Sequence, residues 1–137
     1  MEQTYAIELK NITKRFGKIV ANDGINLKVK RGEILSLLGE NGSGKTTLMN
    51  MISGIYFPDE GLILVDGKAV SIRSPKDSFD LGIGMIHQHF KLIDVMTAAE
   101  NIILGLKGNA VLDMKKVHKD IQELVDRYGF DLDPAQK

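Results

Sequence analysis

The order of apolar and polar residues predicts two half-buried strands at the start of the chain and a buried strand after them. Residues 5–13 alternate between apolar and charged side chains, and residues 25–29 repeat the alternation after a turn at Phe16-Gly17. The apolar run over residues 33–38 is nearly continuous, which is typical of a strand covered on both faces in a parallel sheet. The first third of the chain is therefore predicted to be rich in strands.

Downstream, helical spacing and turn residues predict a mixed α/β order. Asp66-Gly67 is a strong signal for a two-residue hairpin between short strands. Thr97 and Glu100 form a capping-box pattern at the start of a helix that should stop near Gly105. The other predicted elements are a helix from about Lys45 to a cap at Gly54, a helix from Ser74-Pro75 to about Leu81, a buried strand over 82–86, a longer helix closing at Gly129, and a helix start at Asp133-Pro134.

The segment 39–47, which reads G-E-N-G-S-G-K-T-T, fits the phosphate-binding loop pattern G-x-x-x-x-G-K-[ST] between a strand and a helix. Its glycines let the backbone turn sharply and bring successive amides close to a polyanion. The Lys45 ammonium would reach the terminal phosphates, the Thr46 hydroxyl would ligate Mg²⁺, and Thr47 would touch the first phosphate. The alternative is a surface Gly/Ser loop that binds nothing. The predicted nucleotide contacts are Gly39, Asn41, Gly42, Ser43, Gly44, Lys45, Thr46 and Thr47.

Composition narrows the possible partners. The 137 residues include 18 basic and 18 acidic side chains, so there is no basic excess to favour nucleic acid or an anionic membrane. The sequence contains no cysteine, which excludes disulfides and thiolate metal sites and suits a reducing cytosol. The polar start shows neither a signal peptide nor a membrane span, so we expect any link to a membrane to run through a partner.

Four segments in this order and spacing resemble the ATP-binding cassette (ABC) ATPases over essentially the whole chain: the strand with Phe16, the loop 39–47, the stretch 54–61 with Asp66-Gly67, and residues 85–90. Residues 87–105 look most like the tandem-cassette ATPases of bacterial nucleoside and simple-sugar importers. The resemblance implies an α/β fold with a partial P-loop NTPase core. An N-terminal antiparallel β subdomain within 1–94 and the beginning of a helical subdomain in 95–137 are expected with it.

The resemblance also implies roles for single residues. Phe16 matches the aromatic that stacks on adenine, where tyrosine is more usual; a strand-end core phenylalanine is the alternative, and Tyr5 is a weaker competitor. Gln88 matches the Q-loop glutamine, whose amide can reach Mg²⁺ or the attacking water and whose loop touches the membrane subunit. Lys45 and Gln88 are thus the candidate catalytic residues. His87 and His89 lie two apart on an extended segment and make a poor metal site, so packing or loop hydrogen bonds explain them better.

The family also uses a signature motif, a Walker B aspartate with its adjoining glutamate, and a switch histidine, none of which occurs here. The chain is therefore interpreted as the N-terminal part of one cassette. By resemblance, the parent protein would hydrolyse MgATP between two cassettes to drive solute import, bound through a permease to the cytoplasmic face of the membrane. The fragment alone is expected to lack steady turnover, and to self-associate or be partly disordered past about Val95.

Three other interpretations stay open at this point. One is a soluble ABC protein of translation or DNA repair. The importer-like sequence of residues 87–105 and the neutral net charge disfavour this interpretation. Another is an unrelated P-loop kinase or GTPase, for which the strand context and nucleotide preference would differ. The last is a non-catalytic nucleotide-binding or interaction module.

Overall fold

A computed structural model describes residues 5–87, 92–106 and 113–137. The chain forms two compact units, Met1–Ile86 and His87–Lys137, and each is described by itself. The division predicted between residues 94 and 95 concerned functional subdomains and stays a prediction. Within the described residues, no helix is both long enough and apolar enough to pass through a bilayer.

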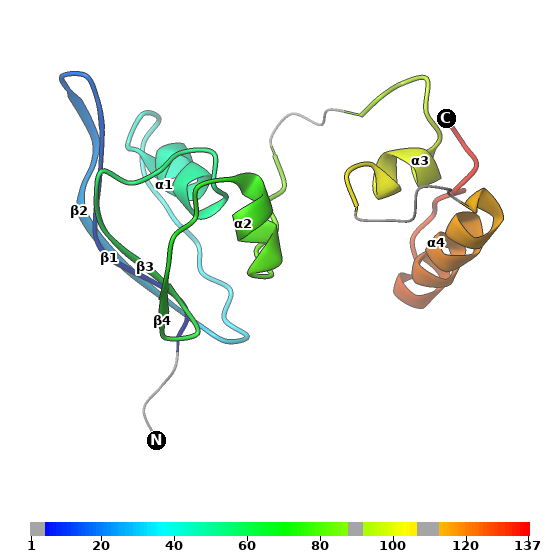
Figure 1. Cartoon of the computed structure of the whole chain (residues 1–137), viewed down its shortest axis with the longest axis horizontal. Coiled ribbons are helices and arrows are strands. Elements are labelled where there is room, and N and C mark those ends of the chain that lie inside the picture. Colours follow the sequence, from blue (N-terminus) through cyan, green and yellow to red (C-terminus); the bar gives the residue numbers. More distant parts are fainter. Residues whose placement is uncertain (1–4, 88–91, 107–112) are drawn as a thin grey trace. The chain divides into compact units, whose positions relative to one another are not determined.

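The first unit contains a four-stranded antiparallel sheet with the order β2-β1-β3-β4 (Figure 1). Strands β1 (Tyr5–Phe16) and β2 (Ile19–Lys30) form a long hairpin, and both strands were predicted from the alternation. Strands β3 (Glu60–Val65) and β4 (Lys68–Val70) form a shorter one. Asp66 and Gly67 take positive φ angles of 50° and 76° in the connecting turn, which explains the Asp-Gly pair there.

Two helices complete the first unit, α1 (Lys45–Ile52) and α2 (Pro75–Asp80). The Ser74 side chain caps α2 by accepting a hydrogen bond from the Asp77 amide, as its sequence indicated. Helix α1 buries an apolar face against the sheet, and removal of this surface from water is the main stabilising contribution. The core residues are Leu9, Ile12, Leu48, Met51, Ile52, Ile63 and Ile72.

The second unit contains α3 (Ala98–Ile103) and α4 (Met114–Tyr128). The predicted capping box is present: Thr97 accepts from the Glu100 amide and Glu100 accepts from the Thr97 amide. Gly129 ends α4 in the left-handed conformation, also as predicted. The two helices meet through Ala99, Ile121 and Val125. Around Asp133 the chain makes only a turn and not a helix.

Two predicted strands are absent, which corrects the sequence interpretation. Residues 33–38 and 82–86 have no strand assignment, and Ile34 and Ile86 are 97% and 88% exposed. A strand covered on both faces needs hydrogen-bonded neighbours and packing on each side. Within the described residues neither segment has a neighbouring strand, and every pairing in the sheet is antiparallel. The parallel layer expected to carry the loop is therefore not formed in the described part of this chain.

Candidate phosphate-binding site

The glycine-rich loop 39–44 reverses the chain and leads directly into α1. Gly42 and Gly44 both have φ of 84°, a left-handed conformation that favours glycine. The Ser43 amide donates to the Glu40 carbonyl at 3.2 Å and closes a tight turn. Gly44 is the N-cap of α1, and no side chain caps the amides of the first turn. The open amides and the positive end of the helix dipole therefore coincide with the end of the loop.

The Lys45 side chain curls back over this loop. Its Nζ donates to the carbonyl oxygens of Gly39 and Glu40, each at 2.7 Å, and to Ser43 Oγ at 3.1 Å. A Cβ built on Gly39 would lie 2.7 Å from Ser43 Oγ and 3.6 Å from Lys45 Nζ, so the absence of a side chain at Gly39 makes room for this packing. The loop thus gathers around a single ammonium group.

All of the hydrogen-bond acceptors of Lys45 within the described residues are neutral oxygens. Phosphate oxygens carry more negative charge than carbonyls and form stronger, charge-assisted bonds with an ammonium. Thr46 is exposed and Thr47 half-buried at the first turn of α1, where hydroxyls suit phosphate or a hard cation. Asn41 and Ser43 are exposed on the loop. The predicted loop residues therefore come together in an arrangement that favours an anion.

Asn22 was not singled out from the sequence, although it supports this loop from β2. Its side chain is buried, and Nδ2 donates to the Gly44 carbonyl at 3.2 Å. A Cβ on Gly44 would lie 2.2 Å from the Ala21 carbonyl oxygen, so strand and loop are in close contact. The available signal was an asparagine inside an alternating strand, where this residue type is disfavoured.

Phe16 ends β1 with 41% of its surface exposed, which does not fit the core alternative. Its ring meets that of Tyr56 edge to face, with centroids 5.2 Å apart and planes at 71°. Lys14 Nζ lies 5.5 Å from the Phe16 centroid. An exposed aromatic ring held by neighbours offers a stacking surface, and its role in binding a base stays a prediction.

Asp59 fixes the end of β1 that carries Phe16. Its carboxylate accepts from the Arg15 amide at 2.6 Å and from Lys14 Nζ at 3.0 Å. The Arg15 amide bond first, and the Lys14 side chain second, lower the pKa of Asp59 below its ordinary value. An ionised Asp59 therefore joins the β1 end to the start of β3.

The predicted Gln88 and His89 lie outside the described residues, so their roles in catalysis, Mg²⁺ binding and packing stay predictions. His87 is the last described residue before them and is exposed. Across residues 5–87, 92–106 and 113–137 there is no group of three or more His, Cys, Asp or Glu side chains placed to hold a metal.

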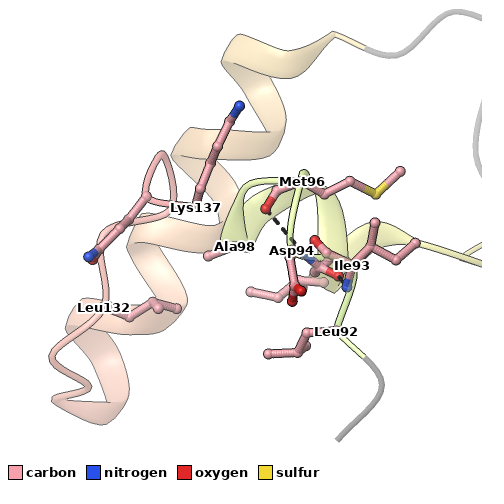
Figure 2. A pocket seen from close by; sticks show the side chains of 10 residues that line it. Leu92, Ile93, Asp94, Met96, Ala98, Leu132 and Lys137 are labelled. Atoms are coloured by element: carbon pink, nitrogen blue, oxygen red, sulfur yellow. Dashed lines mark hydrogen bonds between the residues drawn. The ribbon is translucent and has the colours of Figure 1, made fainter.

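The second unit has a cavity of about 390 Å³, shown in Figure 2. Two of its lining residues, Asn101 of α3 and Ile93, are hydrogen-bonded to each other. Asn101 Oδ1 accepts from the Ile93 amide at 2.9 Å, and Nδ2 donates to the Ile93 carbonyl at 3.1 Å. The lining is largely apolar, with Leu92, Ile93, Met96, Ile102 and Leu132 among its members. Such a hollow favours an apolar side chain of a partner over a charged ligand.

Comparison with known proteins agrees with the loop geometry. Residues 22–137 match the family model described as ABC transporter. The guanosine import ATP-binding protein NupO of Bacillus subtilis is 53% identical over 97% of this chain and 26% of its own length. The nucleoside import ATP-binding protein NupA of Lactococcus lactis is 51% identical over 98% of this chain and 27% of its own. The chain thus spans about a quarter of these curated relatives.

Solved structures give the same result. The dimeric bacterial ABC transporter cassette MJ0796 has a TM-score of 0.73 and 31% identity, covering 95% of this chain and 60% of that one. A nucleotide-free ATP-binding cassette from an ABC transporter has a TM-score of 0.75 and 25% identity, covering 97% and 58%. The fold class is therefore a partial P-loop ABC ATPase with an antiparallel β subdomain. On the family match over most of its length and the loop that the structure shows, this chain belongs to the ABC transporter family.

Proposed function

We propose that this chain is the ATP-binding part of an importer ATPase and that it binds MgATP at the loop 39–47. The observation that carries the proposal is the Lys45 ammonium, held by neutral oxygens over a loop that ends at an uncapped helix N-terminus. Relatives whose names state nucleoside and guanosine import support the same solute class for the parent protein, with simple sugars as the next candidate.

Each part of the site would contact a different part of the nucleotide. Amides of the loop and the first turn of α1 would donate to the phosphate oxygens, aided by the helix dipole. Lys45 would exchange its bonds to the Gly39 and Glu40 carbonyls for bonds to the terminal phosphates, which gains charge-assisted hydrogen bonds. Phe16 would stack on the base, and the Thr46 hydroxyl would hold Mg²⁺. Bound Mg²⁺ would supply neutralisation of the phosphate charge.

Calorimetric titration of the chain with MgATP tests this proposal. We expect binding by the wild-type chain and its loss in Lys45→Ala, because the variant removes the only side-chain cation in the loop 39–47. Lys68→Ala, which removes an exposed lysine of β4, is the matched control and should bind as the wild type does. Equal affinity of wild-type and Lys45→Ala chains would contradict the proposal.

Hydrolysis should require parts that this sequence lacks. Without a glutamate to polarise water and a signature motif from a second cassette, the attacking water is not activated. We expect phosphate release by the chain no faster than by its Lys45→Ala variant. Steady turnover well above that variant would show that the chain is catalytically complete by itself.

The cavity of the second unit supports a peripheral membrane location through a permease subunit. Its largely apolar lining, which includes the exposed Ile102, suits a helix of a membrane partner, which would place the protein at the cytoplasmic face. Co-purification with a permease subunit should fail for Ile102→Glu. Leu124→Glu on α4 is a matched control because Ile102 and Leu124 are both 46% exposed. Equal capture of both variants would argue against this surface.

A second cassette is the other expected partner. The solved relative MJ0796 is described as dimeric, and two cassettes would enclose ATP between the loop of one and the signature of the other. In the chain itself, exposed apolar residues such as Ile34 and Leu38 favour self-association. Light scattering that shows a single monodisperse monomer would count against self-association.

A further inference from the structure

Asn22 is a buried amide that is only half satisfied. It lies in the interior of β2 with 5% of its surface exposed. Nδ2 donates to the Gly44 carbonyl at 3.2 Å, whereas Oδ1 has no hydrogen-bond partner within the described residues. A buried acceptor without a partner destabilises the folded state, so an apolar residue of similar size would serve stability better at this position.

The bond from Asn22 is the second of two hydrogen bonds that hold one particular peptide. The Gly44 carbonyl accepts from the Leu48 amide at 2.9 Å and from Asn22 Nδ2, so both of its lone pairs are used. The peptide that joins Gly44 to Lys45 is planar and trans, so its N–H points opposite to its C=O. Holding the Gly44 carbonyl toward β2 therefore directs the Lys45 amide away from the sheet, at the open end of α1.

We propose that Asn22 is a positioning residue of the phosphate-binding loop: it clamps the Gly44 carbonyl so that the Lys45 amide faces the nucleotide. The inference rests on the proposed binding of MgATP at this loop. Asn22 touches no phosphate itself and acts through the peptide 44–45. The unpartnered Oδ1 then comes with an amide donor placed where β2 closely approaches Gly44 of the loop.

Asn26 shows what an ordinary structural asparagine does in the same strand. Its Oδ1 accepts from the Asn11 amide at 3.0 Å, and its Nδ2 donates to Asn11 Oδ1 at 3.1 Å and to the Gly24 carbonyl at 2.9 Å. All of these bonds stay within the β1–β2 hairpin. Asn26 is exposed whereas Asn22 is buried, but it is a control of the same residue type in the same strand with no link to the loop.

The test compares MgATP affinity and thermal unfolding for the wild-type chain, Asn22→Leu and Asn26→Ala. Loss of one neutral hydrogen bond that pre-orients an amide should weaken MgATP binding by Asn22→Leu about fivefold. The unfolding temperature of Asn22→Leu without nucleotide should stay equal or rise, because a half-satisfied buried amide has been replaced by an apolar side chain. Asn26→Ala should unfold at a lower temperature yet bind MgATP as the wild type does.

The outcomes separate this inference from the proposed function. Wild-type affinity in Asn22→Leu would overturn the inference while leaving MgATP binding intact; no binding by the wild-type chain would overturn both. If Asn22→Leu does not fold, nuclear magnetic resonance of the wild-type chain decides. The Asn22 side-chain amide signals should shift together with the Lys45 amide on addition of MgATP. Shifts of the loop amides with no change at Asn22 would overturn the inference.

Discussion

Replacing Gly44 by alanine should damage the loop far more than the same change at Gly42. Both residues have φ of 84°, so alanine at either site is forced into the left-handed region. That strain costs about 1–2 kcal/mol. The surroundings differ: a Cβ at Gly42 meets nothing within 4 Å, whereas one at Gly44 would lie 2.2 Å from the Ala21 carbonyl oxygen and 2.9 Å from Asn22 Nδ2. The pair therefore isolates the contact between β2 and the loop.

The magnitude follows from how far β2 and the loop must separate. Ordinary van der Waals contact of a Cβ begins near 3.4 Å, so the Ala21 carbonyl has to move by more than an ångström. Overpacking of this kind costs about 1–3 kcal/mol beyond the strain. We expect Gly42→Ala to lose about 1–2 kcal/mol of unfolding free energy and Gly44→Ala about 2–5 kcal/mol.

Urea unfolding followed by circular dichroism measures both losses on the same chain. A second readout is MgATP affinity, which should fall more for Gly44→Ala. Separation of β2 from the loop in this variant would also release the peptide 44–45. Equal unfolding free energies for the two variants would refute the close approach of β2 to the loop. Equal affinities would show that this approach has no part in binding.

Two further predictions concern the stabilising contacts around each unit. Thr97→Ala removes the N-cap of α3 and should lower the unfolding free energy by about 1 kcal/mol in calorimetry. Ser71→Ala removes no cap and only an exposed bond from Arg73 Nε, so it should lower the unfolding free energy far less. For Asp59, the folded-state pKa lies below the ordinary value, so its contribution is complete above the ordinary pKa of about 4 and is lost as pH falls through the lower folded value. Asp59→Asn should thus reduce the loss of stability on acidification, and an unchanged pH profile would contradict this.

Local chemistry made much of the fold predictable. The Asp66-Gly67 turn, the Ser74 cap, the Thr97 capping box and the Gly129 stop each depend on residues within a few positions of one another. Such signals do not need the rest of the molecule, because the donors and acceptors that they satisfy are adjacent in the chain. The phosphate-binding loop belongs to the same class, since its glycines, lysine and helix start follow one another directly.

Contacts between distant segments could not be predicted in this way. Asn22 is 22 positions from Gly44, and only the packing of β2 beside α1 brings them together. The Phe16 and Tyr56 rings likewise meet only after β3 pairs with β1. Neither pair has a spacing that would mark it in the sequence. The strand alternation predicted β2, but it did not indicate which of its side chains faces the loop.

The apolar segments 33–38 and 82–86 have the composition of buried strands but do not form strands. Their residues suit a strand with two covered faces, yet a strand of this kind is stabilised only by neighbours that pair with its amides and pack on its sides. Without such neighbours in the described part of the chain, Ile34 and Leu38 stay 97% and 90% exposed. The same segment leads into Gly39, so its conformation bears on how firmly the loop is held. Pairing of 33–38 with further strands would therefore both cover this apolar surface and stiffen the loop, and we expect it to raise nucleotide affinity.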